Sequence, residues 1–142
     1  MKTLLLSLLV LLAGCVTPAT VRVDDPAPVT YSSRFGTVRL TEGGPQPALV
    51  VLDGQAGGVA FVNDTRDEVY AIRFVGPALP DADSAYARDF RTVGRVTFTP
   101  SPLRPGEGAS VYLYGPGTYA FEVCESGRSA YRGQLRLELP ER

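Results

Sequence analysis

Few side chains in this 142-residue sequence could carry out acid–base or nucleophilic chemistry. The chain has no histidine, and its single lysine is Lys2. The usual general bases and the lysine that forms a Schiff base are therefore missing from the rest of the chain. Asp64, Asp67 and Glu68 stand close together, but a charged cluster is more often solvated surface than a pair of catalytic carboxylates. The sequence therefore predicts that the protein is not an enzyme.

Metal ligands are equally scarce, and Cys124 is the only candidate that we single out. Tetrahedral zinc needs four ligands, and Cys124 with the neighbouring Glu122 and Glu125 falls short of that number. The stretch DADSAY, residues 81–86, begins like a calcium loop but lacks the glycine that such loops have at the sixth position. A blue-copper centre needs two imidazoles and a thiolate, of which this chain offers at most the thiolate. We predict that the protein binds no metal and no other cofactor.

The N-terminal residues have the order of a bacterial export signal. A positive charge at Lys2 precedes an apolar run over 4–12, which is shorter than the roughly 20 residues that span a bilayer. The sequence Leu-Ala-Gly-Cys follows at 12–15 and resembles the lipobox of bacterial lipoproteins. The resemblance implies a signal peptide over 1–14 and a lipid on Cys15, with palmitate-type acyl chains that anchor the protein in the membrane.

The position of the anchor also predicts a location. Val16 follows Cys15 where an aspartate would oppose sorting to the outer membrane, as that rule is known for similar lipoproteins. We therefore expect a protein of the cell envelope, on the periplasmic face of the outer membrane if the source is Gram-negative. Residues 15–34 are rich in proline and threonine and show little apolar periodicity, so we predict a flexible tether there.

The lipid on Cys15 would leave Cys124 as the only cysteine side chain of the mature protein that could react. Two interpretations stay open in an oxidising compartment. Cys124 is either a buried, inert thiol that packs as a small hydrophobe, or a residue that reacts or forms a disulfide with a partner. The lack of lysine or histidine nearby to lower its pKa favours the first.

From 35 to 142 the chain consists of short apolar stretches between Gly, Pro, Asn and Asp, and we predict one domain there. Such spacing is typical of an all-β sandwich, with Leu135, Leu137 and Leu139 sharing one face of the last strand. A short helical insertion over 81–90, with Asp81 or Asp83 as the cap, is the one predicted exception. The predicted strands lie at 36–41, 47–53, 58–64, 68–75, 95–100, 109–114, 118–123 and 134–140.

Three motifs in this domain together resemble the cupredoxins, the plastocyanin-like β-sandwiches of small blue-copper electron carriers. The first is VAFVND followed by VYAIRF, at 59–64 and 69–74. The second is LRPGEGASVYLYGPGTY at 103–119, and the third is GTYAFEVCESGRSAYRGQLRL at 117–137. The resemblance implies a cupredoxin-like Greek-key β-sandwich.

The same resemblance implies where copper ligands would stand, and other residues occupy those positions. Aligned without a gap, the cysteine position holds Val123, the first histidine position Val69 or Tyr70, the second histidine position Ser126, and the methionine position Tyr131. The third motif does contain a cysteine, but one residue late. The resemblance therefore implies a scaffold that has kept its fold and lost its copper ligands, with Tyr131 filling the space of the metal.

What remains is a prediction of a binding role. Fourteen basic residues against fifteen acidic ones give none of the basic excess of a nucleic-acid binder. Tyr112 and Tyr114 alternate with apolar residues, so both would face outward if those apolar residues lie in the core. The two tyrosines would then either offer apolar rings with a polar tip to a partner or pack under the tether or the 77–94 insertion. The resemblance adds a second surface at Tyr131 and Arg132, near the end that meets partners in redox relatives.

We therefore predict an envelope protein that interacts with another envelope protein or belongs to an assembly. One alternative is a spacer that binds no partner. The other alternative is a copper-binding, electron-transfer protein with an atypical site at Cys124.

Overall fold

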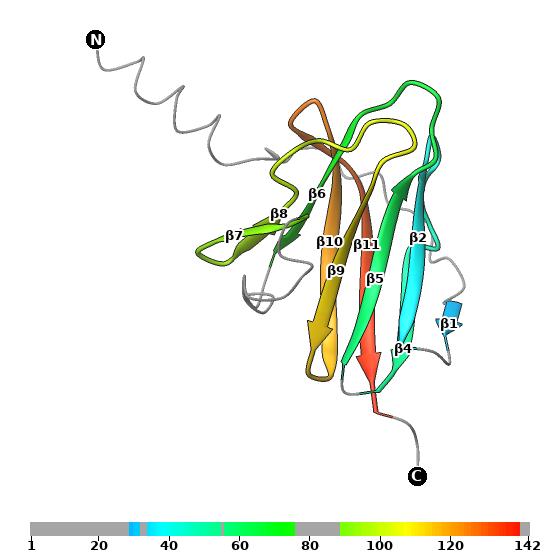
Figure 1. Ribbon diagram of the computed structural model, residues 1–142, viewed down its shortest axis with the longest axis vertical. Helices are drawn as coiled ribbons and strands as arrows, with labels where there is room; N and C mark the ends of the chain where they lie inside the picture. Colours follow the sequence, from blue (N-terminus) through cyan, green and yellow to red (C-terminus); the bar gives the residue numbers. More distant parts are fainter. Residues whose placement is uncertain (1–28, 32–33, 55, 76–88, 140–142) are drawn as a thin grey trace.

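The computed structural model describes residues 29–31, 34–54, 56–75 and 89–139, which form two facing β-sheets (Figure 1). The four-stranded sheet has the order β3-β2-β5-β9, with β3 at Gly44–Gln46, β2 at Phe35–Thr41, β5 at Ala56–Asn63 and β9 at Gly108–Tyr114. The seven-stranded sheet has the order β1-β4-β11-β10-β6-β8-β7. Its strands are β1 (Val29–Tyr31), β4 (Leu49–Asp53), β11 (Arg128–Glu138), β10 (Gly117–Glu125), β6 (Tyr70–Val75), β8 (Val96–Phe98) and β7 (Arg91–Val93).

Both sheets mix parallel and antiparallel pairs. In the seven-stranded sheet β1 pairs with β4 and β4 with β11 in parallel, and in the four-stranded sheet β2 pairs with β5 in parallel. The remaining pairs are antiparallel, including the long β10–β11 hairpin and the β5–β9 pair. The prediction of an all-β sandwich is confirmed, because apolar side chains from both sheets meet in a single core.

The core is built by alternation along the strands. Phe61 of β5 lies at its centre, with the Phe121 ring 5.0 Å away and the Phe74 ring 6.0 Å away, both edge-to-face between ring centroids. Such aromatic pairs contribute roughly 0.5–1.5 kcal/mol each beyond the burial of their area. Leu135 and Leu137 of β11 join this core, whereas the strand ends at Glu138, before the predicted residue 140, and Leu139 beyond it is exposed.

Three short strands escaped the prediction. Strand β1 lies within the stretch predicted to be tether, and its pairing with β4 corrects that prediction for Val29–Tyr31. Its residues Val-Thr-Tyr have high β propensity, but three residues are too few to show alternation. Strands β3 and β7 are equally short.

Other predictions fall on residues that the structure does not describe. The signal peptide, Cys15 and most of the tether lie in 1–28, and the helical insertion lies in 81–90, of which only Asp89 and Phe90 are described. Within the described ranges there is no helix. Accordingly, no helix in that part of the chain has the length and hydropathy needed to span a membrane.

Candidate functional site

Three of the four residues at the copper-ligand positions come together at one end of the sandwich. Val123 is fully buried and pairs with Ile72 on one side and with Tyr131 on the other. The rings of Tyr70 and Tyr131 meet edge-to-face with their centroids 6.4 Å apart. Ser126 lies apart from them, exposed in the β10–β11 turn with a positive φ of 51°.

The two tyrosines close this end of the core. The Tyr131 hydroxyl donates a hydrogen bond of 2.6 Å to the backbone carbonyl of Glu42, and the Tyr70 hydroxyl donates one of 3.4 Å to that of Thr41. The Tyr131 ring also lies so close to Gly44, which has a φ of +110°, that a Cβ there would stand 2.8 Å from it. Tyr131 therefore ties β11 to the β2–β3 turn and packs against the core rather than standing free on the surface.

The electrostatics at this end favour a neutral phenol. Burial raises the pKa of Tyr70 to about 12, and nearby Tyr131, Glu125, Glu68 and Glu42 add to the shift. A hydrogen bond with Glu125 raises the pKa of Glu68, whereas backbone hydrogen bonds lower the pKa of Glu42. Among the described residues, no group of three or more His, Cys, Asp or Glu side chains is placed to hold a metal ion.

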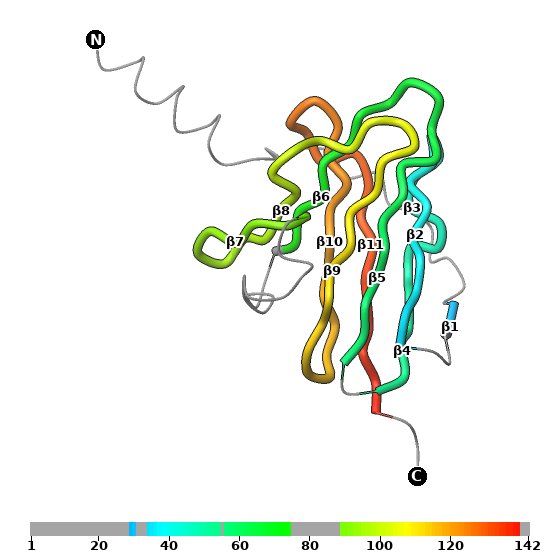
Figure 2. Tube along the Cα trace, viewed as in Figure 1, coloured from blue at the N-terminus to red at the C-terminus, as the bar shows by residue number. Residues whose placement is uncertain are grey.

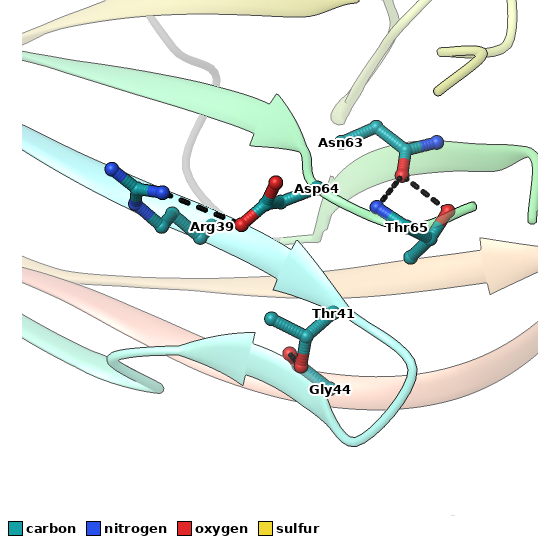
Figure 3. Close-up of polar contacts among 6 residues, drawn as sticks. All are labelled: Arg39, Thr41, Gly44, Asn63, Asp64 and Thr65. Atoms are coloured by element: carbon teal, nitrogen blue, oxygen red, sulfur yellow. Dashed lines mark hydrogen bonds and ion pairs between the residues drawn. The ribbon is translucent and has the colours of Figure 1, made fainter. Parts of the chain in front are cut away.

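The loop after β5 is held by its own hydrogen bonds (Figure 3). The buried Asn63 amide donates to the backbone carbonyls of Glu68 and Leu103, both at 2.8 Å. Its carbonyl oxygen accepts from the Thr65 backbone N–H at 3.1 Å and from the Thr65 hydroxyl at 2.7 Å. All of these contacts fix the loop to its neighbours, so Asn63 is a structural residue.

The outer face of the seven-stranded sheet is charged. Glu122 of β10 lies between Arg73 of β6, at 2.6 Å, and Arg132 of β11, at 3.4 Å. The side chains of Glu122 and Arg73 are only 11% and 14% exposed. Because successive side chains of a strand point to opposite faces, Arg132 lies on this outer face while Tyr131 faces inward. The two residues that the prediction joined in one surface therefore belong to opposite sides of β11.

Cys124 lies on the same outer side as Glu122. It is buried, with 2% of its surface exposed, but it is not part of the central core cluster. In the β10–β11 pair, a β-bulge on β11 shifts the register directly after the Val123–Tyr131 pair. As a result, Cys124 lies opposite Ser129. Cys124 is disulfide-bonded, which corrects the favoured interpretation of an inert thiol.

Tyr112 and Tyr114 lie on the outer face of the four-stranded sheet, as predicted. Val111 and Leu113 between them are buried, and the two tyrosine rings lie 4.8 Å apart with an angle of 57° between their planes. Phe35 on β2, which the sequence analysis missed, extends this aromatic group, and it is 59% exposed. In cross-strand register Phe35 pairs with Gly58, and Gly58 pairs with Tyr112.

Gly58 is the reason that these rings approach each other. A Cβ at this position would lie 3.0 Å from the Phe35 ring and 3.4 Å from the Tyr112 ring, so both rings lean over the bare glycine backbone. The next row across the sheet is Thr37, Ala60 and Ser110, and the third is Arg39, Val62 and Gly108. The outward positions of the central strand β5 are therefore all small or apolar.

A signal for this face was present in the sequence. Strand β5 reads Ala-Gly-Gly-Val-Ala-Phe-Val-Asn, with no polar residue before its last position. Sheets with one solvated face normally alternate apolar and polar residues, and continuous apolar strands are typical of sheets covered on both faces. The missing alternation is therefore the sequence signal for a largely uncharged outer face on this sheet.

Comparison with known proteins adds similar solved structures. No protein-family model matches the chain, and no curated protein does. The dithionite-reduced auracyanin from the photosynthetic bacterium Roseiflexus castenholzii is 18% identical, with 76% of this chain and 99% of that one covered and a TM-score of 0.49. Auracyanin B is 18% identical, with 89% and 95% covered and a TM-score of 0.49. An oxidised amicyanin variant is 14% identical, with 82% and 85% covered and a TM-score of 0.41. Similarity at this level says nothing about copper or any other ligand.

Proposed function

We propose that this protein is a lipid-anchored component of the cell envelope. Its β-sandwich, a cupredoxin-like domain without copper ligands, would serve as a protein-interaction or assembly module. The observation that carries the proposal is the outer face of the four-stranded sheet, where Phe35, Tyr112 and Tyr114 lie beside small uncharged residues. Protein interfaces favour aromatic residues and exclude charge from their centres.

The geometry of the two tyrosines favours a protein over a saccharide as the partner. Their ring planes are inclined by 57°, so Tyr112 and Tyr114 offer no common flat platform for a sugar ring. Because Tyr131 packs inward, we assign the partner contact to the face that carries Tyr112 and Tyr114, and no longer to a second surface at Tyr131 and Arg132.

In-cell photo-crosslinking tests the interaction role. A photoreactive phenylalanine analogue at Tyr114, which is 51% exposed, should form covalent adducts with a protein in intact cells. The same analogue at Thr118, which is exposed on the other sheet, is the matched control and should form few. Equal capture at both positions, or none at either, would contradict the proposal.

The anchor at Cys15 rests on the lipobox resemblance alone and needs its own test. The mass of the mature protein should correspond to a chain that begins at Cys15 and carries acyl chains. Changing Cys15→Ser should move the protein from the membrane fraction to the soluble fraction. Cys15 is the only cysteine besides Cys124. One molecule can therefore carry a lipid thioether on Cys15 or a disulfide between Cys15 and Cys124, but not both. The same mass measurement distinguishes them.

Copper electron transfer through Cys124 has weaker support. Cys124 lies on the outer side of its sheet, whereas Val123, Tyr131 and Tyr70 fill the inner end at which the family's metal would stand. We expect titration with Cu(I) and Cu(II) to give no stoichiometric binding that depends on Cys124. One tight copper that is lost in Cys124→Ala would revive this alternative.

A further inference from the structure

We propose that the β7–β8 hairpin, residues 91–98, is a second contact of this protein with its membrane. Val93 enters the headgroup region of the bilayer, and Arg91 and Arg95 bind anionic phospholipid headgroups. The inference goes beyond the proposed interaction face, and it rests on the proposed lipid anchor, which keeps the domain beside a membrane. The hairpin consists of β7, a turn at Gly94 and Arg95, and β8.

The tip of this hairpin is uncovered. Figure 2 shows that it projects beyond the body of the sandwich. Val93 is 61% exposed, more than any other large apolar residue in the described part of the chain. Gly94 forms the turn with a φ of +62°, and a Cβ at this position would meet no atom within 4 Å. The valine side chain therefore adds nothing to the core and is available to a surface outside the molecule.

The charges beside Val93 are positive. Arg91 and Arg95 are both exposed, and neither forms an ion pair with a described residue. Asp89, the nearest acidic residue along the chain, is turned towards β9, where its carboxylate accepts a hydrogen bond of 2.9 Å from the Ser110 N–H. Phosphate is the chemical complement of such guanidinium groups, because arginine binds it through two parallel hydrogen bonds.

The arrangement of the three side chains favours a bilayer over a protein as the occupant. Arg91 and Val93 share one face of β7, because alternate residues of a strand point to the same side, and Arg95 follows in the turn. In a bilayer the phosphates lie next to the acyl chains, so an interfacial contact combines positive charge with an apolar tip. A protein interface excludes charge from its centre and buries about 800 Å² per partner, which one valine between two arginines does not provide.

Pairing of β7 with a strand of another protein is the alternative use of this hairpin. Strand β7 is the edge of the seven-stranded sheet and has three residues. Short edge strands that carry charged side chains oppose such pairing. Contact through the tip is therefore the geometry that we favour.

The proposed anchor lies within reach of this contact. Strands β1 and β7 are the two edges of the seven-stranded sheet, and about six strand spacings of 4.8 Å place them roughly 29 Å apart. Residues 15–29 connect the proposed lipid to β1. A chain of about 14 residues can extend to roughly 46 Å. A protein held at Cys15 can therefore place the hairpin on the same bilayer.

The contact should be weak and should depend on the anchor. Each arginine near an anionic bilayer strengthens binding about fivefold, and burial of one valine adds about tenfold. Val93 buries far fewer methylene groups than an acyl chain does, so the hairpin alone would not hold the protein on a membrane. In the anchored protein, the hairpin meets lipid at a high effective concentration and would fix the orientation of the domain.

Fluorescence quenching of the protein, purified from its own membranes and reconstituted into vesicles, tests this contact. A maleimide fluorophore on Val93→Cys should be quenched by a nitroxide-labelled phospholipid in phosphatidylglycerol vesicles, and much less in phosphatidylcholine vesicles. Leu139→Cys is the matched control, because Leu139 is 53% exposed and lies outside the hairpin, and its label should be quenched little in either lipid. The parent chain, in which Cys124 is buried, is the blank for labelling.

Charge reversal tests the role of the two arginines. Arg91→Glu together with Arg95→Glu should lower the quenching of the Val93→Cys label at least about threefold in phosphatidylglycerol vesicles. Arg34→Glu together with Arg104→Glu, at two exposed arginines outside the hairpin, changes the net charge equally and should leave the quenching unchanged. Both double variants should keep the urea midpoint of the parent, because all four arginines are exposed.

The contrary outcomes are distinguishable. A protein that enters neither kind of vesicle would lack the anchor, which overturns both the proposed anchorage and this inference. Equal quenching of the Val93→Cys and Leu139→Cys labels in an anchored protein would overturn this inference alone, and so would equal quenching of the Val93→Cys label in the two lipids. In intact cells, a photoreactive phenylalanine analogue at Val93 should capture phospholipid. Capture of a protein in its place would overturn the bilayer as the occupant of the hairpin.

Discussion

On the outer side of the seven-stranded sheet, a buried carboxylate, Glu122, lies between two arginines. On the outer side of the four-stranded sheet, the equivalent central positions hold Gly58 and Ala60, with aromatic rings beside them. Both sheets pack on the same core, so the packing of the core does not explain why their outer faces differ in charge. The charged face pairs its charged groups with one another, whereas the outer face of the four-stranded sheet exposes the rings of Phe35 and Tyr114. The comparison indicates that the first face stabilises the fold, and the second is the face on which the proposed interaction rests.

The largest expected effect comes from removing the charge at the centre of the first face. Glu122→Ala takes away the carboxylate that contacts the buried Arg73, and breaking such a pair costs about 3–5 kcal/mol in the free energy of unfolding. Asp64→Ala breaks the Arg39 pair at the edge of the other sheet, where the side chains are 66% and 55% exposed, and should cost at most about 1 kcal/mol. Urea unfolding of both variants checks the comparison. Equal losses would mean that the largely buried Glu122–Arg73 pair stabilises the fold no more than the exposed Arg39–Asp64 pair does.

The next effect separates the inward tyrosine from the outward ones. Tyr131→Ala removes a ring that packs against Tyr70 and Gly44, and we expect a loss of about 2–4 kcal/mol. Tyr114→Ala removes an exposed ring and should change the free energy of unfolding by about 0.5 kcal/mol or less. Thermal unfolding measures both. A larger loss for Tyr114→Ala than for Tyr131→Ala would contradict the account, because it would mean that the outward tyrosine stabilises the fold more than the inward one.

A smaller effect concerns pH and the closed end of the core. The pKa of Tyr70 is raised to about 12 from an ordinary 10.0, so the folded state holds its proton more tightly than the unfolded state. The resulting stability is complete below about pH 10 and is lost as pH rises towards about 12. Tyr70→Phe should therefore lose less stability than the wild type over this range, as followed by urea midpoints at several pH values. Parallel curves for the two proteins would contradict the burial of this phenol.

Much of the fold followed from alternation in the sequence. Each predicted strand corresponds to one of the other eight strands. Most of them have apolar residues at every second position, whereas β4 and β5 are short, nearly continuous apolar runs. Strands β1, β3 and β7 have three residues each, and only their pairing with distant strands creates them. No local pattern of three residues carries that information.

The candidate site was predictable in part. The outward position of Tyr112 and Tyr114 followed from the same alternation, and so in principle did the opposite orientation of Tyr131 and Arg132. Phe35 was missed because its neighbours Gly58 and Tyr112 come from other strands, and register joins them only in the folded sheet. The bulge after Val123 is likewise a property of the β10–β11 pairing rather than of either strand.

Hydroxyl-radical footprinting of the unmodified protein tests most directly whether the outer face of the four-stranded sheet is the proposed contact surface. Oxidation of Phe35, Tyr112 and Tyr114 would be compared between native membranes and dilute detergent solution, with the exposed Leu139 as an internal reference outside that face. We expect the three aromatic residues to be several-fold less oxidised in membranes, while Leu139 is oxidised equally in both. Equal oxidation of the aromatic residues in the two conditions would contradict the account.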